Sequence, residues 1–254
     1  YFQGWYLFGG NFAWMGIHLW YLLVLFLFSL LLLPLFLAIK QGKGQNSIDK
    51  LVSALEKPMV IFLLSLPIVI LESGLDPTTL GIRVAGGWNL FTYLIFLLCG
   101  YLIVVEPRIE QGVHRHFTPT LIIAVFTTPI LLELIYDRLA GNQSVYGSLG
   151  YTLITVLRSF NAWCWIVAFL SLGKKILGFN SSALQYMSEA SLPFYMLHQP
   201  IILSIGFWIA GWQMGTLPKF IVLSLVSFIA IALFYELLVR RIGVLRFFFG
   251  LKPI

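Results

Sequence analysis

Charge is scarce in this sequence. Of its 254 residues only 10% are Asp, Glu, Lys or Arg, whereas 59% are hydrophobic and 16% are aromatic. A soluble globular domain carries about 25% charged residues, so this chain is too poor in charge to cover an ordinary core with a water-facing surface. This scarcity excludes a typical soluble enzyme and indicates an integral membrane protein.

Other common features are missing as well. There is no Gly-x-Ser-x-Gly elbow, phosphate loop, dinucleotide fingerprint, internal repeat or long polar insertion. The two cysteines, Cys99 and Cys164, lie inside apolar runs and are expected to be buried thiols. His114 and His116 fall short of a metal-ligand set, so we predict a solvated loop there and no metal site. One integral membrane domain over residues 1–254 is expected.

Long apolar segments are what the sequence has in abundance. A bilayer core about 30 Å thick requires about 20 apolar residues in a helix. The candidate span from Pro58 to Leu75 is interrupted by Pro67. The pattern predicts an all-α, polytopic transmembrane helix bundle with about seven spans. These are roughly Ile17 to Ile39, Pro58 to Leu75, Trp88 to Val105, Pro119 to Tyr136, Leu149 to Leu172, Leu192 to Trp212 and Pro218 to Val239.

The basic residues are distributed unevenly between the two sides of this bundle. One side carries only Arg83, Arg138 and Lys219. By the positive-inside rule the other side is cytoplasmic, which places the C-terminus inside and Tyr1 outside. The net charge of +6 then reflects topology and contact with anionic lipid, and no nucleic-acid partner is predicted. The cytoplasmic set is Lys40, Lys43, Lys50, Lys57, Arg108, Arg115, Lys174, Lys175, Arg240, Arg241, Arg246 and Lys252.

Arg158 is the one basic residue expected near the middle of the bilayer. It lies about 14 Å from the outer end of its helix, at 1.5 Å per residue. An Arg at this depth costs at least about 2.5 kcal/mol, so it should face protein or a hydrated cavity and have a partner. A functional site is one interpretation, and a buried ion pair that only fixes helix packing is the other.

A second polar group lies at a similar depth, in "LPFYMLHQPIIL" (192–203). Tyr195 precedes His198 by three residues and therefore shares its helix face, Gln199 follows, and Pro200 frees the carbonyl of Met196. A lone membrane histidine can serve only as an interhelical hydrogen-bonding residue. The convergence of several polar groups favours a site, which we expect to be shared with Arg158.

Further candidates lie toward the outer side. Asn11, His18 and Trp20 occur where the first predicted span leaves the interface, a pattern equally typical of a binding site and of an aromatic belt. Glu133 is predicted about 6 Å deep, where it could orient His18 or receive an acceptor hydroxyl. Glu72 and Asp76 are assigned to an outer loop and interpreted as surface residues.

Three segments of the chain together resemble one known family. They are "GIHLWYLLVLFLFSLLL", "SEASLPFYMLHQPIILSIGFWIAG" and "FYELLVRRIGVLRFFFGLKP", which contain a His-Leu-Trp pattern, a Tyr-x-x-His and a Tyr-Glu followed by a basic-aromatic tail. Their types and order are similar to those of the acyltransferase-3 family of bacterial membrane proteins. That resemblance implies an enzyme that moves an acyl group, usually from cytoplasmic acetyl-CoA, to a hydroxyl of an envelope carbohydrate, without a metal.

The resemblance also implies roles for residues and a longer parent. His198 would be the base, Arg158 would bind the donor's phosphates or the developing oxyanion, and Tyr195 would lie beside the acyl group. Gln199, His18, Trp20, Asn11 and Glu133 would contact substrate. Family members have about ten helices, and the first carries a catalytic histidine that no segment here matches, so we expect three preceding helices in the parent. The expected location is the bacterial inner membrane.

Two other classes of protein remain open on the sequence alone. A transporter or flippase-like protein would also have kinked helices and polar residues at mid-depth. A non-catalytic membrane component could use the same polar groups only to lock its helices together.

Overall fold

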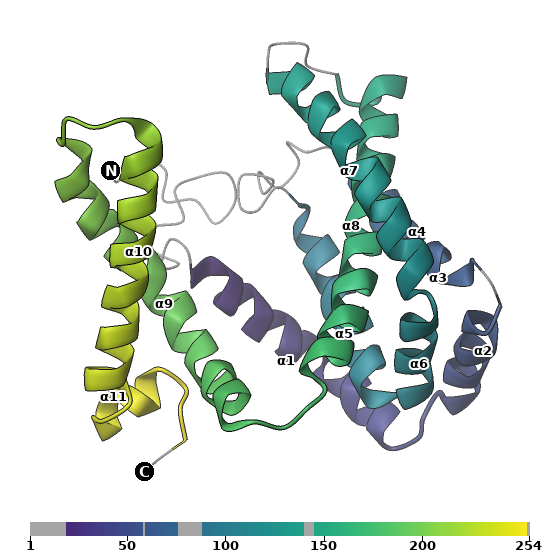
Figure 1. Cartoon of the computed structure of the whole chain (residues 1–254). Helices are drawn as coiled ribbons and strands as arrows, with labels where there is room; N and C mark the ends of the chain where they lie inside the picture. The colour runs from purple at the N-terminus through teal and green to yellow at the C-terminus, as the bar shows by residue number, and fades with distance from the viewer. Residues whose placement is uncertain (1–18, 58, 76–87, 140–144, 253–254) are drawn as a thin grey trace. The chain divides into compact units, whose positions relative to one another are not determined.

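The structure is a computed structural model that describes residues 19–57, 59–75, 88–139 and 145–252. Within these ranges every regular element is a helix (Figure 1), which confirms the predicted all-α class. By their internal contacts, the residues form two compact units, Tyr1–Gly178 and Phe179–Ile254. A single membrane domain over the whole chain stays a prediction.

The first unit is built around the long helix α8 (Leu149–Leu177), which runs beside α7 (Phe117–Leu139) in Figure 1. Trp163 on α8 is 1% exposed, and its indole Nε1 donates to the Ile61 carbonyl at 2.8 Å. This bond attaches α8 to the short helix α3 (Val60–Leu63). The other helices of the unit are α1 (Trp20–Lys40), α2 (Gln45–Leu55), α3 (Val60–Leu63), α4 (Leu66–Gly74), α5 (Leu90–Val105) and α6 (Pro107–Arg115).

A polar seam fixes α7 against α8. The Asn161 Nδ2 group lies 2.8 Å from Thr127 Oγ1, 3.0 Å from Thr128 Oγ1 and 3.1 Å from the Ala124 carbonyl. Trp165 Nε1 donates to Thr128 Oγ1 at 2.9 Å. Buried amide donors in an apolar bundle need such partners, and they set the rotation of a helix against its neighbour. Asn161 thereby fixes the rotation of the α8 turn that also carries Arg158.

Membrane-spanning length is reached by fewer helices than expected. Among the described residues, five helices are long and apolar enough to cross a bilayer, and a sixth span is possible if α5 and α6 are one broken span bent by 105°. The second predicted span is instead divided into α3 and α4, and Val60–Gly74 is too short to count. Pro67 lies in the first turn of α4, where its missing N–H costs least, so the proline begins a new helix.

The second unit is a helical hairpin. Helix α9 (Ser182–Ala210) packs against α10 (Thr216–Phe234), which continues as a π-helical turn, η4 (Tyr235–Val239), before α11 (Gly243–Phe248) (Figure 1). Its apolar centre is small. The buried residues are Ala190, Leu197, Ile231, Tyr235, Val239 and Leu251.

An ion-pair network joins α2 to the start of α6. The Glu106 carboxylate accepts from Arg108 Nε at 2.8 Å, and Arg108 Nη2 also reaches Asp49 on α2 at 2.8 Å. The hydrogen bonds from Arg108 lower the pKa of Glu106 from 4.5 to about 2. A carboxyl group whose pKa is lowered by folding stabilises the fold above its unfolded pKa and loses that contribution as the pH falls toward the folded value.

This network predicts a shallow acid sensitivity. Between pH 5 and pH 2 the thermal midpoint of the purified protein should fall, and Glu106→Gln should have a lower midpoint at pH 7 but a flatter dependence on pH. The loss should stay below about 1 kcal/mol, because the pair is close to solvent. Thermal unfolding in detergent at a series of pH values measures the pH dependence of the midpoint for both proteins. An identical pH slope in the variant and the wild type would contradict the assignment.

Candidate functional site

A fully buried carboxylate occupies the first unit. Glu72 on α4 is 0% exposed, and its Oε1 accepts from the Asn89 backbone N–H at 2.7 Å and from Thr92 Oγ1 at 2.5 Å. Both donors belong to the segment that begins α5. The prediction of Glu72 as a surface residue was therefore wrong, because α4 extends past it to Gly74 and the start of α5 covers it. Asp76 lies outside the described residues.

Arg158 belongs to the same region. Its guanidinium carbon lies 3.9 Å from the centre of the Trp88 ring, a cation–π contact with the residue just before Asn89. Tyr93 follows Thr92 directly on α5. Arg158 is only half-buried, and it faces protein, as the cost of placing an Arg in a span demands. We call Glu72, Trp88, Asn89, Thr92, Tyr93 and Arg158 the carboxylate cluster.

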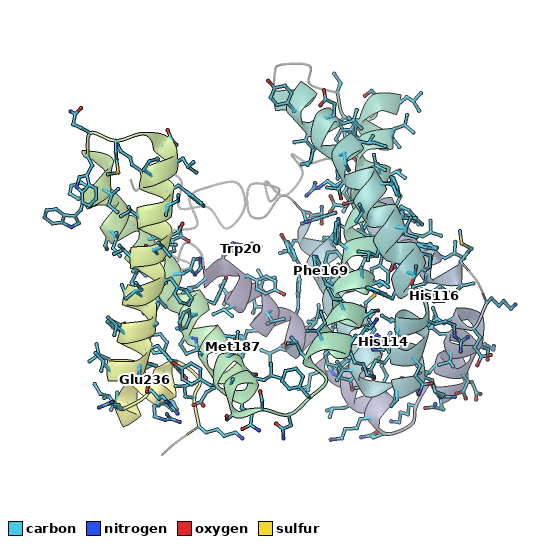
Figure 2. The ribbon with its side chains drawn as sticks, in the orientation of Figure 1. Trp20, His114, His116, Phe169, Met187 and Glu236 are labelled. Carbon is cyan, nitrogen blue, oxygen red and sulfur yellow. The ribbon has the colours of Figure 1, made fainter. Side chains whose placement is uncertain are left out.

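Aromatic residues of α1 extend this cluster. The Trp20 and Tyr21 rings meet the Tyr93 ring edge-on, with centroids 5.5 Å and 5.9 Å apart, and Figure 2 labels Trp20 at the start of α1. Of the predicted outer group, Trp20 is thus placed next to the cluster. Asn11 and His18 lie outside the described residues, so their roles stay predictions.

Glu133 is separate from the carboxylate cluster. Its side chain is exposed on α7, whereas Glu72 is enclosed between α4 and α5. The predicted contact of Glu133 with His18 involves a residue that the structure does not describe. A substrate-binding role for Glu133 therefore stays a prediction.

In the second unit, His198 has a defined hydrogen bond. Its ring Nδ1 lies 2.6 Å from the carbonyl oxygen of Tyr195, one helical turn earlier on α9. A carbonyl can only accept, so Nδ1 carries a proton and donates it. In the neutral imidazole this tautomer leaves the lone pair on Nε2, the nitrogen that can act as a base. The Tyr195 and His198 rings lie with their centroids 5.7 Å apart.

A groove between α9 and α10 holds these two residues. Its volume is about 490 Å³. Ser227 on its α10 wall is 2% exposed, and its hydroxyl has no hydrogen-bond partner within the described part of the chain. Gln199 is half-buried on α9 but does not line the groove. We call this the histidine groove, and its lining residues are Phe194, Tyr195, His198, Ile202, Phe220, Leu223, Ser224, Ser227, Phe228 and Ile231.

Sequence reasoning missed the serines of the histidine groove. Ser224 and Ser227 are three residues apart on α10, which puts them on one helix face in an otherwise apolar segment. That spacing was the available signal. The groove therefore combines an imidazole, a phenol and two hydroxyls with apolar walls, which suits a substrate that has a polar end and an apolar arm.

Arg158 and His198 belong to different units, the first on α8 and the second on α9. In the first unit Arg158 belongs to the carboxylate cluster around Glu72. In the second unit His198 lines the histidine groove. That the two sites form one shared pocket stays a prediction.

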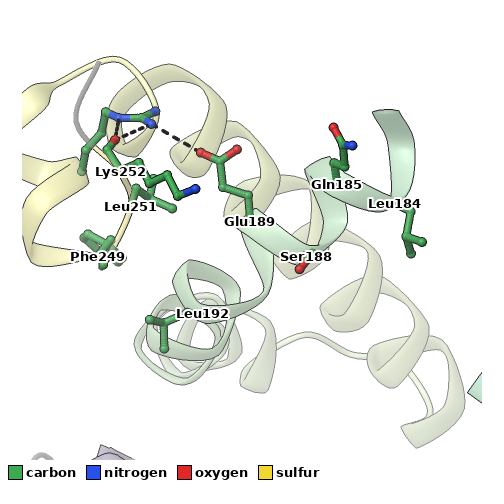
Figure 3. Close-up of a pocket in the computed structure, with 10 residues that line it drawn as sticks. Leu184, Gln185, Ser188, Glu189, Leu192, Phe249, Leu251 and Lys252 are labelled. Carbon is green, nitrogen blue, oxygen red and sulfur yellow. Dashed lines mark hydrogen bonds and ion pairs between the residues drawn. The ribbon is translucent and has the colours of Figure 1, made fainter. Parts of the chain in front are cut away.

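A larger cavity lies beside the C-terminal segment of the second unit. It has a volume of about 700 Å³, and Figure 3 shows it between the start of α9 and the tail after α11. Arg246 donates to the Lys252 carbonyl through Nε at 2.9 Å and Nη2 at 2.7 Å, and to the Arg240 carbonyl at 3.0 Å. Its Nη2 also lies 3.4 Å from Glu189 Oε1. Arg246 therefore mainly holds the segment after α11 in place through hydrogen bonds to the Lys252 carbonyl.

The structure around His114 and His116 differs from the prediction. The predicted solvated loop is the amphipathic helix α6, and His116 just after it is only 6% exposed, with Nδ1 donating to the Gly112 carbonyl at 2.7 Å. The loop prediction was wrong because the alternation of charged and apolar residues in "PRIEQGVHR" lets one face pack on α2 and α8. Among the described residues no three His, Cys, Asp or Glu side chains gather as a metal site.

Comparison with known proteins places the chain in a family. A family model described as an acyltransferase domain matches residues 1–236, and the chain therefore belongs to the acyltransferase-3 family. Similar proteins include those called glucans biosynthesis protein C in Salmonella paratyphi B, Salmonella dublin and Salmonella enteritidis. Each is 27% identical over 246 residues, which cover 93% of this chain and 61% of the relative. No solved structure matches.

Proposed function

We propose that this protein is a membrane O-acyltransferase that moves an acyl group, acetyl from acetyl-CoA, to a hydroxyl of an envelope carbohydrate. Membership of the acyltransferase-3 family supports the reaction class. The printed name of the relatives, glucans biosynthesis protein C, supports a glucan-like acceptor. Since the chain spans 61% of the length of those relatives, the activity is proposed for the protein encoded by the complete gene.

The observation that carries the proposal is the hydrogen bond between His198 and the Tyr195 carbonyl beside the histidine groove. With Nδ1 donating to the Tyr195 carbonyl, the lone pair of the neutral ring lies on Nε2, and His198 lines the histidine groove. In the proposed step Nε2 takes the proton of the acceptor hydroxyl as its oxygen attacks the thioester carbonyl. The C–S bond then breaks, the ester remains on the sugar, and the thiolate leaves and takes up a proton. A base of this kind contributes about 10² to 10⁴ in rate.

Arg158 supplies positive charge in this proposal. It would bind either the donor's phosphates or the oxyanion that develops on the thioester carbonyl, since a guanidinium suits both. Tyr195 would lie beside the acyl group, while Gln199, Trp20, His18, Asn11 and Glu133 would contact the substrates. The reaction needs no metal.

The proposed location is the bacterial inner membrane, with the C-terminus in the cytoplasm. The excess of Lys and Arg on one side of the predicted bundle supports this orientation. The donor would then enter from the basic cytoplasmic side and the acceptor from the opposite side.

Labelled acetyl-CoA tests the function. Inverted membrane vesicles that contain the protein expressed from its complete gene should release CoA and place the label on a glucan enclosed in their lumen, whereas vesicles without the protein should not. Movement of a solute or lipid across the membrane with the thioester left intact would instead identify a transporter and would overturn the proposal.

A further inference from the structure

A cavity rich in basic residues lies in the first unit, where α6 ends, α7 begins and α8 ends. Its volume is about 400 Å³, and Figure 2 labels His114, one of its lining residues. We call it the basic pocket. Its lining residues are His114, Arg115, Phe117, Thr118, Ser171, Lys174 and Lys175.

The basic pocket has more positively charged side chains than the nearby carboxylates neutralise. Lys174 Nζ lies 2.6 Å from Glu110 Oε1, and His114 Nε2 lies 3.4 Å from the same oxygen. Glu110 is thus already engaged, and it holds Lys174 in place. Arg115 and Lys175 are exposed, and no carboxylate of the described residues lies within ion-pair distance of either. Two positive charges therefore remain for a ligand.

The chemistry of this lining suits a phosphate ester. A guanidinium offers paired donors to phosphate oxygens, an ammonium offers a compact charge, and the Thr118 hydroxyl adds a neutral donor. Three separate helices supply these groups, so their convergence does not follow from a single run of charge. We propose that the basic pocket binds a phosphate ester through Arg115, Lys175 and Thr118.

The position of the pocket along α8 indicates which phosphate ester it would take. Lys174 follows Arg158 by 16 residues on the uninterrupted helix α8, or about 24 Å at 1.5 Å per residue. A CoA thioester has its phosphates at one end and its acyl group at the end of a long arm. Resting on the proposed function, the inference places the donor's phosphates in the basic pocket and leaves Arg158 for the oxyanion. An anionic phospholipid headgroup has the same phosphate chemistry.

Titration with free CoA tests this assignment. Purified protein from the complete gene would be titrated calorimetrically with CoA, which carries no acyl group, as wild type and as the Arg115→Gln/Lys175→Gln variant. We expect affinity at least about tenfold weaker in the variant, equivalent to about 1.4 kcal/mol. Lys40→Gln/Lys43→Gln removes the same charge elsewhere on the predicted inner side and should bind like the wild type. Equal thermal midpoints exclude misfolding.

A second arm separates the two sources of phosphate. Nanodiscs of phosphatidylcholine with or without phosphatidylglycerol would be compared by native mass spectrometry of retained lipid. Loss of bound phosphatidylglycerol in the double variant, with no CoA binding in the wild type, supports the pocket with a lipid as its occupant. If the variant retains both ligands as well as the wild type does, or the wild type binds neither, the assignment is overturned.

The outcome is independent of acyl transfer. CoA binding that depends on Arg115 and Lys175 in a protein that transfers no acetyl group would keep the pocket and reject the proposed function. Acetyl transfer with CoA affinity unchanged in the double variant would support the proposed function and reject the basic pocket as the site of the phosphates.

Discussion

Replacing His198 by alanine is expected to lower the rate of acetyl transfer from acetyl-CoA about 10²- to 10⁴-fold, because the base that accepts the hydroxyl proton is lost. The effect should appear in kcat, with KM for acetyl-CoA little changed, since in this proposal the imidazole acts on the acceptor. The rate at which membranes that contain the protein from its complete gene release CoA from acetyl-CoA measures both constants. The histidine groove itself should persist, because its walls are mostly apolar residues of α9 and α10.

The control for this variant lies on the same helix. Ser204 is exposed on α9, and its hydroxyl only donates to the Pro200 carbonyl at 2.8 Å. Ser204→Ala should therefore retain full turnover, while both variants should unfold at the wild-type temperature. Turnover of His198→Ala within a few-fold of the wild type would remove His198 from the chemistry.

Loss of the buried carboxylate should have the largest effect on stability. In Glu72→Ala the Asn89 N–H and the Thr92 hydroxyl both lose their acceptor inside the first unit. Leaving two buried donors without an acceptor costs about 1–3 kcal/mol for each donor. Thermal unfolding in detergent, followed by tryptophan fluorescence, should show a large fall in the midpoint.

Two matched variants separate hydrogen bonding from charge at this position. Glu72→Gln keeps a side-chain oxygen for both donors and should lose less stability than Glu72→Ala. Glu133→Ala removes an exposed carboxylate on α7 and should change stability by less than about 0.5 kcal/mol. A Glu72→Ala protein as stable as Glu133→Ala would contradict the role of Glu72 in joining α4 to α5.

The presence of the helices could be predicted from the sequence. An apolar run about 20 residues long can span a bilayer, where a helix satisfies its backbone hydrogen bonds internally. The all-α class with several membrane-spanning helices followed from this. What could not be predicted was where a segment breaks. Pro67 interrupts the second segment, but only packing decides that α3 and α4 are separate helices and that Trp163 caps the end of α3 by bonding the Ile61 carbonyl.

The candidate site was only partly accessible to sequence reasoning. Arg158 and His198 stood out because polar groups in apolar runs are costly. Glu72 did not, since a carboxylate at the end of an apolar run resembles a loop residue until α5 folds over it. Burial of His116 was equally hidden, because it depends on the side of α6 that packs on α2 and α8.

The bend of 105° between α5 and α6 has a consequence for the bilayer itself. Helix α5 has 16 residues and is therefore about 24 Å long, less than the roughly 30 Å of a typical hydrocarbon core. Hydrophobic mismatch of this size is relieved by local thinning of the lipid. The leaflet next to α6 should be indented, so that an aqueous ligand on that side approaches the mid-plane more closely than the average membrane thickness allows.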